Sequence, residues 1–184
     1  MGMDQDILEI LYSEEELKRR VAVLGEQISR DYADKDNVVL VGILRGSYIF
    51  MADLSRSITI PCRIDFMAAS SYGKGTSSSG QIEIKKDLSD PIQNAHVILV
   101  EDILDSGNTL SYLLELLRAR KPASMKLCTL LDKPDRRVKE VHVDYSGFTI
   151  PDEFVVGYGL DYAEKYRNLP YIGILKPRVY GGEG

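Results

Sequence analysis

Residues 97–110, VILVEDILDSGNTL, pass from an apolar strand through a short polar loop into a helix. Residues 97–100 are four consecutive apolar, mostly β-branched residues, which is typical of the end of a buried strand. Two carboxylates, Glu101 and Asp102, follow directly. A strand that leads through a polar loop into a helix is one unit of an α/β fold. The loop contains Asp105, Ser106, Gly107, Asn108 and Thr109.

The chemistry of this loop suits a phosphate. Small polar residues that open a helix offer free backbone N–H groups, hydroxyls and the positive end of the helix dipole. Carboxylates would repel a phosphate, so Glu101 and Asp102 are expected to hold neutral hydroxyls or a bridging divalent cation. The segment therefore predicts a phosphorylated sugar as ligand, with Asp105 where a reacting group could sit. An ordinary turn with a capping Ser or Thr is the alternative, and the ordered combination favours the functional interpretation.

Helices and apolar strands alternate along the rest of the chain. A first helix begins at Ser13, where Glu16 completes a capping box, and its apolar stripe recurs at helical spacing. This alternation predicts an α/β fold with a mainly parallel sheet flanked by helices, in which ligands bind at the carboxyl ends of the strands. No repeat or linker divides residues 1–184, which predicts a single domain. The predicted strands are 38–43, 63–69, 97–100, 126–131, 154–158 and 171–175, with 81–88 as the return strand of a hairpin.

Composition bounds the class of protein. The chain has 184 residues, 44% of them apolar and 28% charged, which is typical of a globular domain with a real core. A net charge of −5 argues against a nucleic-acid-binding surface. The acidic N-terminal sequence predicts no signal peptide, and no apolar run reaches membrane-spanning length.

The cysteines and histidines predict neither a zinc site nor a disulfide framework. Cys62 and Cys128 lie in predicted buried strands, and we interpret them as reduced core residues of a cytoplasmic protein, with a disulfide as the alternative. His96 and His142 are isolated and lack the spacing of zinc ligands, so both are expected to be structural.

The 97–110 run resembles the 5-phosphoribosyl-1-diphosphate (PRPP) signature of the type I phosphoribosyltransferases, and more narrowly of the hypoxanthine-guanine phosphoribosyltransferases. Leu44-Arg45-Gly46-Ser47 resembles the family's pyrophosphate loop, in which a cis peptide precedes the glycine. Many members have Lys where this chain has Arg45. A backbone contact would survive that exchange, whereas a contact through the ammonium would change. A plain strand–helix turn is the alternative interpretation of these four residues.

A second resemblance concerns the purine. Lys133, in LDKPD, matches the family's contact to the 6-oxo group, and an ammonium only donates hydrogen bonds, which disfavours the amino group of adenine. Residues 150–173 resemble the base-binding and metal segment. The resemblance implies that Phe154 stacks on the purine and that the backbone of Val155 meets the base edge. The alternatives are a surface Lys and a core Phe.

The same segment implies further roles. Asp161 would contact the base through its main chain and Mg²⁺ through its carboxylate, and Arg167 would reach the pyrophosphate. A surface Asp/Arg pair is the alternative. Mg²⁺ would be bound by Glu101, Asp102 and Asp161. The residues that the resemblance assigns to PRPP are Arg45, Gly46, Ser71, Tyr72, Glu101, Asp102, Asp105, Ser106, Gly107, Asn108, Thr109 and Arg167.

The resemblance covers about residues 38–177 and implies the type I phosphoribosyltransferase fold, with a small hood and a flexible hairpin loop. It implies purine salvage: phosphoribosyl transfer from PRPP to N9 of hypoxanthine or guanine, giving IMP or GMP and pyrophosphate, with Asp105 as general base at N7. Residues 70–80 contain five Ser and three Gly and predict a lid that carries the Ser71–Tyr72 pair. A disordered hairpin tip is the alternative.

Two other functions remain open. One is a phosphoribosyltransferase for xanthine or another base, and the second is an RNA-binding attenuation regulator of the same fold. Asp105, Lys133 and the net acidity argue against the regulator. The residues do not rank hypoxanthine, guanine and xanthine, and they do not fix the number of metal ions. The family resemblance implies a homodimer or homotetramer.

Overall fold

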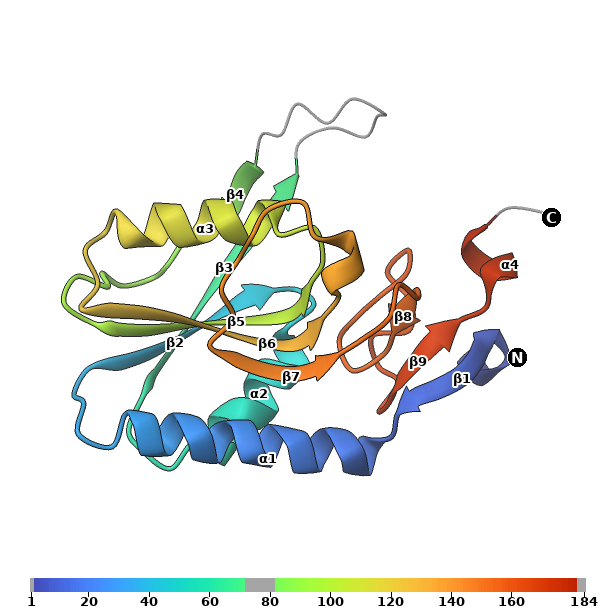
Figure 1. Ribbon diagram of the computed structural model, residues 1–184, viewed down its shortest axis with the longest axis horizontal. Coiled ribbons are helices and arrows are strands. Elements are labelled where there is room, and N and C mark those ends of the chain that lie inside the picture. The colour runs from blue at the N-terminus through green and yellow to red at the C-terminus, as the bar shows by residue number, and fades with distance from the viewer. Residues whose placement is uncertain (1, 72–81, 182–184) are drawn as a thin grey trace.

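The computed structural model contains a six-stranded sheet between helices and a smaller three-stranded sheet beside it (Figure 1). It describes residues 2–71 and 82–181. The six-stranded sheet has the order β4-β3-β2-β5-β6-β7, and all its pairings are parallel except that of β4 with β3. The prediction of a mainly parallel sheet is therefore confirmed. The strands are β2 (Val38–Leu44), β3 (Arg63–Ser71), β4 (Ile82–Lys86), β5 (His96–Leu104), β6 (Ser124–Asp132) and β7 (Tyr145–Thr149).

Helices cover both faces of this sheet. Helices α1 (Glu14–Asp31) and α2 (Tyr48–Ser57) lie on one face, and α3 (Asn108–Arg118) lies on the other (Figure 1). The strands between them are apolar on both sides, as buried parallel strands are. In β2, Val38 and Leu40 pack with α1 and α2, whereas Val39 and Val41 pack with α3.

Helix α1 begins as its sequence predicts. The Glu16 N–H donates to the Ser13 hydroxyl at 3.3 Å, and the Ser13 N–H donates to the Glu16 carboxylate at 2.8 Å. This capping box satisfies two backbone groups that the first turn leaves unpaired. The helix then buries its predicted apolar stripe against the sheet. The stripe consists of Leu17, Val21, Leu24 and Ile28.

The smaller sheet forms the predicted hood. Its order is β1-β9-β8, entirely antiparallel, and it joins the two ends of the described chain. The predicted strand 171–175 contains β9, whereas the sequence analysis did not predict β1 or β7. The hood contains β1 (Ile7–Tyr12), β8 (Val155–Val156) and β9 (Ile172–Leu175), with the 3-10 turn η1 (Met3–Asp6) before it and α4 (Pro177–Tyr180) after it.

Several predicted boundaries were wrong. Strand β5 runs to Leu104, because β6 continues to pair with it beyond the apolar run. The predicted strand 154–158 ends at Val156, because Gly157 and the residues after it adopt positive φ. Cys62 is half-buried and precedes β3, so it is not a buried strand residue. Cys128 is buried in β6 as predicted, and both thiols are free.

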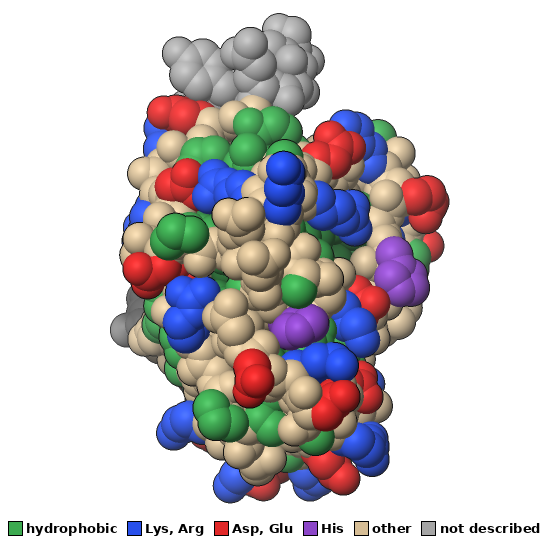
Figure 2. All heavy atoms as spheres, turned by 90° about the vertical axis from the view of Figure 1, so that its left-hand side faces the viewer, with side chains coloured by type: hydrophobic (Ala, Val, Ile, Leu, Met, Phe, Trp, Pro, Cys, Tyr) green, Lys and Arg blue, Asp and Glu red, His purple; other side chains and the backbone are tan. Residues whose placement is uncertain are grey.

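Two further expectations can be compared only with the residues that the structure describes. The hairpin of β3 and β4 exists, but Tyr72 and the rest of the predicted lid beyond Ser71 lie outside the described residues. Within 2–71 and 82–181, no helix combines the length and the apolarity needed to cross a bilayer. Acidic and basic side chains are interspersed over the face that lies at the left of Figure 1 (Figure 2).

Candidate active site

The loops after β2 and β5 meet at the carboxyl edge of the sheet. Strand β2 pairs with β5 only as far as Gly42 and Val100, so the end of β5 leaves one edge free beside residues 44–47. Gly46 occupies that space: a Cβ there would lie 1.8 Å from the Asp102 carboxylate. Only glycine allows the loop to come so close. The Leu44–Arg45 peptide is cis, as the resemblance implied.

A cavity of about 250 Å³ opens at this meeting point. It joins most of the residues predicted for the phosphate and the ribose, which come from two separate stretches of sequence. Arg45 and Asn108 do not line it, and neither does Ser71, an exposed residue at the end of β3. The predicted residues that line it are Gly46, Glu101, Asp102, Asp105, Ser106, Gly107 and Thr109.

The predicted phosphate loop, residues 105–109, turns sharply into α3. Gly107 is the N-cap residue with φ of 83°, and a Cβ there would lie 2.4 Å from the Lys139 carbonyl oxygen. Glycine therefore provides both the left-handed conformation and the close approach. Asn108 and Thr109 belong to the first turn of α3, not to the loop as predicted. Glycine has no side chain to cap the helix, and the Asn108 N–H donates to the Ser106 hydroxyl at 3.4 Å. The start of a helix carries a partial positive charge that suits an anion.

The acidic pair sits in a costly environment. Glu101 is buried, and this burial, followed by the charge of Asp102, raises the pKa of its carboxyl well above the ordinary value. One Glu101 oxygen accepts the Asp102 N–H at 3.1 Å, and one Asp102 oxygen accepts the Ile103 N–H at 2.8 Å. A cationic ligand or a set of hydroxyls would relieve the repulsion between the two carboxylates.

Lys133 lies beside the phosphate loop. It follows β6, and its backbone N–H donates to the Leu104 carbonyl at 3.0 Å, directly before Asp105. Its side chain is 7% exposed, with the ammonium 3.7 Å from the Asp152 carboxylate. The predicted purine contact and the predicted general base are therefore neighbours, although 28 positions separate them in the numbering.

The hood supplies the aromatic residue. Phe154 stacks on Tyr180 of α4 with ring centroids 4.8 Å apart, and it meets Tyr162 edge to face at 5.4 Å. Val155 follows in β8, the edge strand of the hood, and pairs with Ile174 of β9. The sequence analysis did not identify Tyr180, which lies outside the segment that resembles the family.

The predicted pyrophosphate residues are joined by ion pairs. Arg45 contacts Glu164 at 2.5 Å, and Arg167 lies 3.9 Å from the same carboxylate oxygen. Arg167 also contacts Asp161 at 3.1 Å and donates to the Gly159 carbonyl at 2.7 Å. Its buried Nε has no hydrogen-bond partner among the described residues. Neither arginine lines the cavity, so they form a second group of cations beside it.

Arg137 is a further residue that sequence reasoning missed. Its Nε donates to the Asp105 carbonyl at 3.1 Å, and its guanidinium pairs with Asp132 at the end of β6. The next two residues donate their N–H groups to the Ser106 carbonyl at 2.9 and 3.0 Å. This segment therefore clamps the phosphate loop from outside. No local pattern in the sequence signals it.

Comparison with known proteins shows the family of the chain. Residues 8–163 match the phosphoribosyl transferase domain family. The chain belongs to that family. A hypoxanthine phosphoribosyltransferase of Salmonella typhimurium is 54% identical over 167 residues, which is 90% of this chain and 94% of that protein. The crystal structure of a Staphylococcus aureus hypoxanthine phosphoribosyltransferase superposes with a TM-score of 0.92 at 51% identity, covering 97% and 96% of the two chains.

Some relatives are much longer. The bifunctional protein TilS/HprT of Listeria monocytogenes is 52% identical over 179 residues, which is 97% of this chain but 28% of that protein. The chain thus spans little more than a quarter of this relative.

Proposed function

We propose that this phosphoribosyl transferase family member transfers the phosphoribosyl group of PRPP to N9 of hypoxanthine, guanine or both, in purine salvage. The products are IMP or GMP and pyrophosphate. The observation that carries the proposal is the cavity in which Glu101, Asp102 and the Asp105–Thr109 loop meet Gly46, with Lys133 beside it. The printed names of two similar proteins, from Salmonella typhimurium and Staphylococcus aureus, support the same activity.

PRPP would be held at three points. The amides and hydroxyls at the start of α3 would bind the 5′-phosphate. Glu101 and Asp102 would bind the ribose hydroxyls, because carboxylates accept hydrogen bonds from neutral donors. The backbone of residues 44–47 and the guanidinium of Arg167 would hold the pyrophosphate.

The acidic pair also fits Mg²⁺. This ion binds proteins through one or two carboxylates and completes its coordination with water and substrate oxygens. Within residues 2–71 and 82–181, no three His, Cys, Asp or Glu side chains form a cluster suited to a metal, so the three predicted ligands Glu101, Asp102 and Asp161 do not converge directly. Asp161 would join through water. When bound, Mg²⁺ would offset the negative charge that grows on the pyrophosphate.

The reaction would proceed through an oxocarbenium-like transition state. The charges of Glu101 and Asp102 favour the developing cation of the sugar, and Arg167 favours the departing anion. Asp105 would take or carry the proton at N7 of the purine, and its exposed carboxylate lies at the cavity. Lys133 would donate to the 6-oxo group, while Phe154 would cover the purine face and the Val155 backbone would meet the base edge.

We also propose a single phosphoribosyltransferase domain over residues 1–184, located in the cytoplasm and assembled as a homodimer or homotetramer. Free Cys62 and Cys128 support a reducing compartment. The net charge of −5 supports small-molecule substrates over nucleic acid.

The decisive experiment measures pyrophosphate release from PRPP with hypoxanthine, guanine, xanthine and adenine in turn, with and without Mg²⁺. We expect release with hypoxanthine or guanine, and none with adenine. Release with xanthine alone would favour the other phosphoribosyltransferase, and no turnover together with a gel shift of structured RNA would favour the regulator.

A further inference from the structure

Residues 157–159 form a strained turn between the hood and the sheet. Their φ angles are 98° at Gly157, 51° at Tyr158 and 103° at Gly159. Left-handed backbone is inexpensive for glycine and costly for a large residue such as tyrosine. A Cβ at position 159 would lie 2.2 Å from the Gly46 carbonyl oxygen, so this turn packs directly on the pyrophosphate loop.

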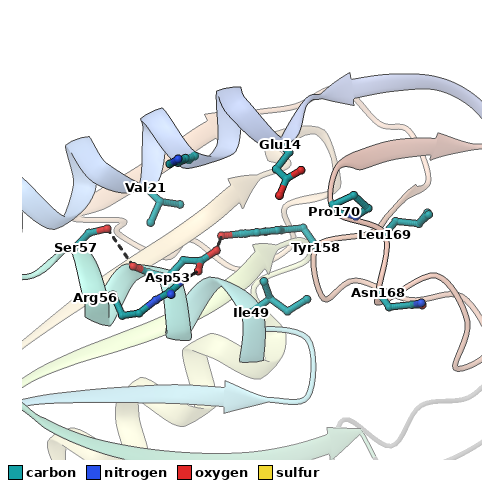
Figure 3. Close-up of a pocket in the computed structure, with 11 residues that line it drawn as sticks. Glu14, Val21, Ile49, Asp53, Arg56, Ser57, Tyr158, Asn168, Leu169 and Pro170 are labelled. Atoms are coloured by element: carbon teal, nitrogen blue, oxygen red, sulfur yellow. Dashed lines mark hydrogen bonds and ion pairs between the residues drawn. The ribbon is translucent and has the colours of Figure 1, made fainter.

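The side chain of Tyr158 reaches away from this contact toward α2. Its hydroxyl donates a hydrogen bond to the Asp53 carboxylate, and Asp53 also pairs with Arg56 one turn later (Figure 3). Tyr158 is buried, and burial followed by the bond to Asp53 raises the pKa of its phenol, so the hydroxyl keeps the proton that it donates. The pair spans a cavity of about 650 Å³ between α1, α2 and residues 168–170 (Figure 3).

The strained turn also holds Arg167. The Gly159 N–H donates to the Arg167 carbonyl at 2.9 Å, and the Arg167 guanidinium donates to the Gly159 carbonyl at 2.7 Å. Helix α2, which carries Asp53, begins directly after residues 44–47. The Tyr158–Asp53 bond therefore joins the two elements on which the pyrophosphate contacts stand.

We propose that Tyr158 and Asp53 are positioning residues for pyrophosphate, which act through Gly159 to hold Arg167 at a fixed separation from Gly46. The proposal rests on the proposed function, because it assumes that these elements bind the pyrophosphate of PRPP. The positive φ at Tyr158 occurs between its hydrogen bond to α2 and the close approach of Gly159 to Gly46. Strained backbone persists where the surrounding structure holds it in this way.

Three variants test this role. Tyr158→Phe removes only the hydroxyl, and Asp53→Asn removes only the charge of its acceptor. Arg56→Gln is the matched control, because Arg56 is largely exposed and, among the described residues, its only ion pair and side-chain hydrogen bond are with Asp53. We expect Tyr158→Phe to raise the KM for PRPP by roughly three- to tenfold, the effect of one lost hydrogen bond, while the KM for the purine stays within about twofold. Asp53→Asn should show a smaller effect in the same direction, and Arg56→Gln none.

Two measurements do not depend on turnover. Calorimetry with inorganic pyrophosphate and Mg²⁺ should show weaker binding to Tyr158→Phe by the same factor. Hydrogen exchange should be faster at the amides of Tyr158 and Gly159. Unchanged pyrophosphate affinity, or an equal rise in both KM values with a lower melting temperature, would overturn the positioning role. If the unaltered protein bound pyrophosphate and the variant bound it less well, yet no purine were converted, the proposed function alone would fail.

Discussion

The proposed phosphate-and-ribose side and the proposed purine side of the candidate site are built on different parts of the fold. The first consists of loops that directly follow β2 and β5, two strands buried on both faces of the large sheet. The second stands on the hood, where β8 has two residues and Phe154 packs on Tyr180 from the far end of the described chain. The loops of the first side are positioned by the buried strands of the core. The residues of the second side are positioned by contacts between segments that are distant in the sequence.

This difference predicts that changes at the loops affect turnover and that changes in the hood affect purine affinity. A side chain on the loops after β2 and β5 can be exchanged without disturbing the strands below it, so its loss should reduce turnover and leave the fold intact. The hood has a smaller cluster of buried hydrophobic residues than either face of the large sheet. We therefore expect changes in the hood to act mainly on the binding of the purine.

The largest effect is expected at the loop. Asp105→Asn should lower kcat by about two to four orders of magnitude, which is the usual contribution of a general base. The fold should be unchanged, because Arg137 binds residue 105 through its backbone carbonyl and not through its side chain. Steady-state kinetics and a melting curve of the purified variant test both statements. A kcat near that of the unaltered protein would exclude Asp105 from the chemistry.

Lys133→Ala tests the boundary between the two sides. Loss of a charged hydrogen bond costs about 1.5–3 kcal/mol, so the KM for the purine should rise by roughly ten- to a hundredfold, while the KM for PRPP changes little. Arg136→Ala is the control, because Arg136 contacts the same Asp152 carboxylate from an exposed position. A rise confined to the KM for PRPP would contradict the placement of Lys133.

Tyr180→Ala tests the hood directly. A stacked aromatic pair contributes about 0.5–1.5 kcal/mol, so loss of the ring behind Phe154 should raise the KM for the purine by roughly two- to tenfold. Tyr180→Phe keeps the stacked ring and should behave as the unaltered protein does. If both variants changed the KM for PRPP instead, the proposed contact between Phe154 and the purine would be wrong.

The smallest effect is on stability. Because the folded protein raises the pKa of Glu101, ionisation of this carboxyl destabilises the fold as the pH rises through that value. Without Mg²⁺, Glu101→Gln should therefore match the unaltered protein at about pH 4 and melt at a higher temperature at about pH 8. A gain of about 1 kcal/mol would appear as about 2–4 °C. The same difference at both pH values would show that the charge is not its cause.

The sequence revealed the two sides unequally. Residues 97–110 could be interpreted because a buried strand, its acidic end and its loop are contiguous, and local patterns report such units well. The hood could be inferred only from resemblance, because β1 lacks a clear apolar alternation and its partner β9 lies at the other end of the chain. Arg137, Asp152 and Tyr180 had no local signal, since their importance comes from residues that only the fold brings near them.

The pairing of β1 with β9 sets an order of events during synthesis. Ile7 pairs with Leu175, and the phenols of Tyr166 and Tyr171 bond to Asp6 and Asp4. As the chain emerges from the ribosome, strands β2 to β7 can pair before β9, the partner of β1, has been synthesised. We therefore expect β1 to be among the last strands to pair. An unpaired strand offers free N–H and C=O groups that can pair with another chain.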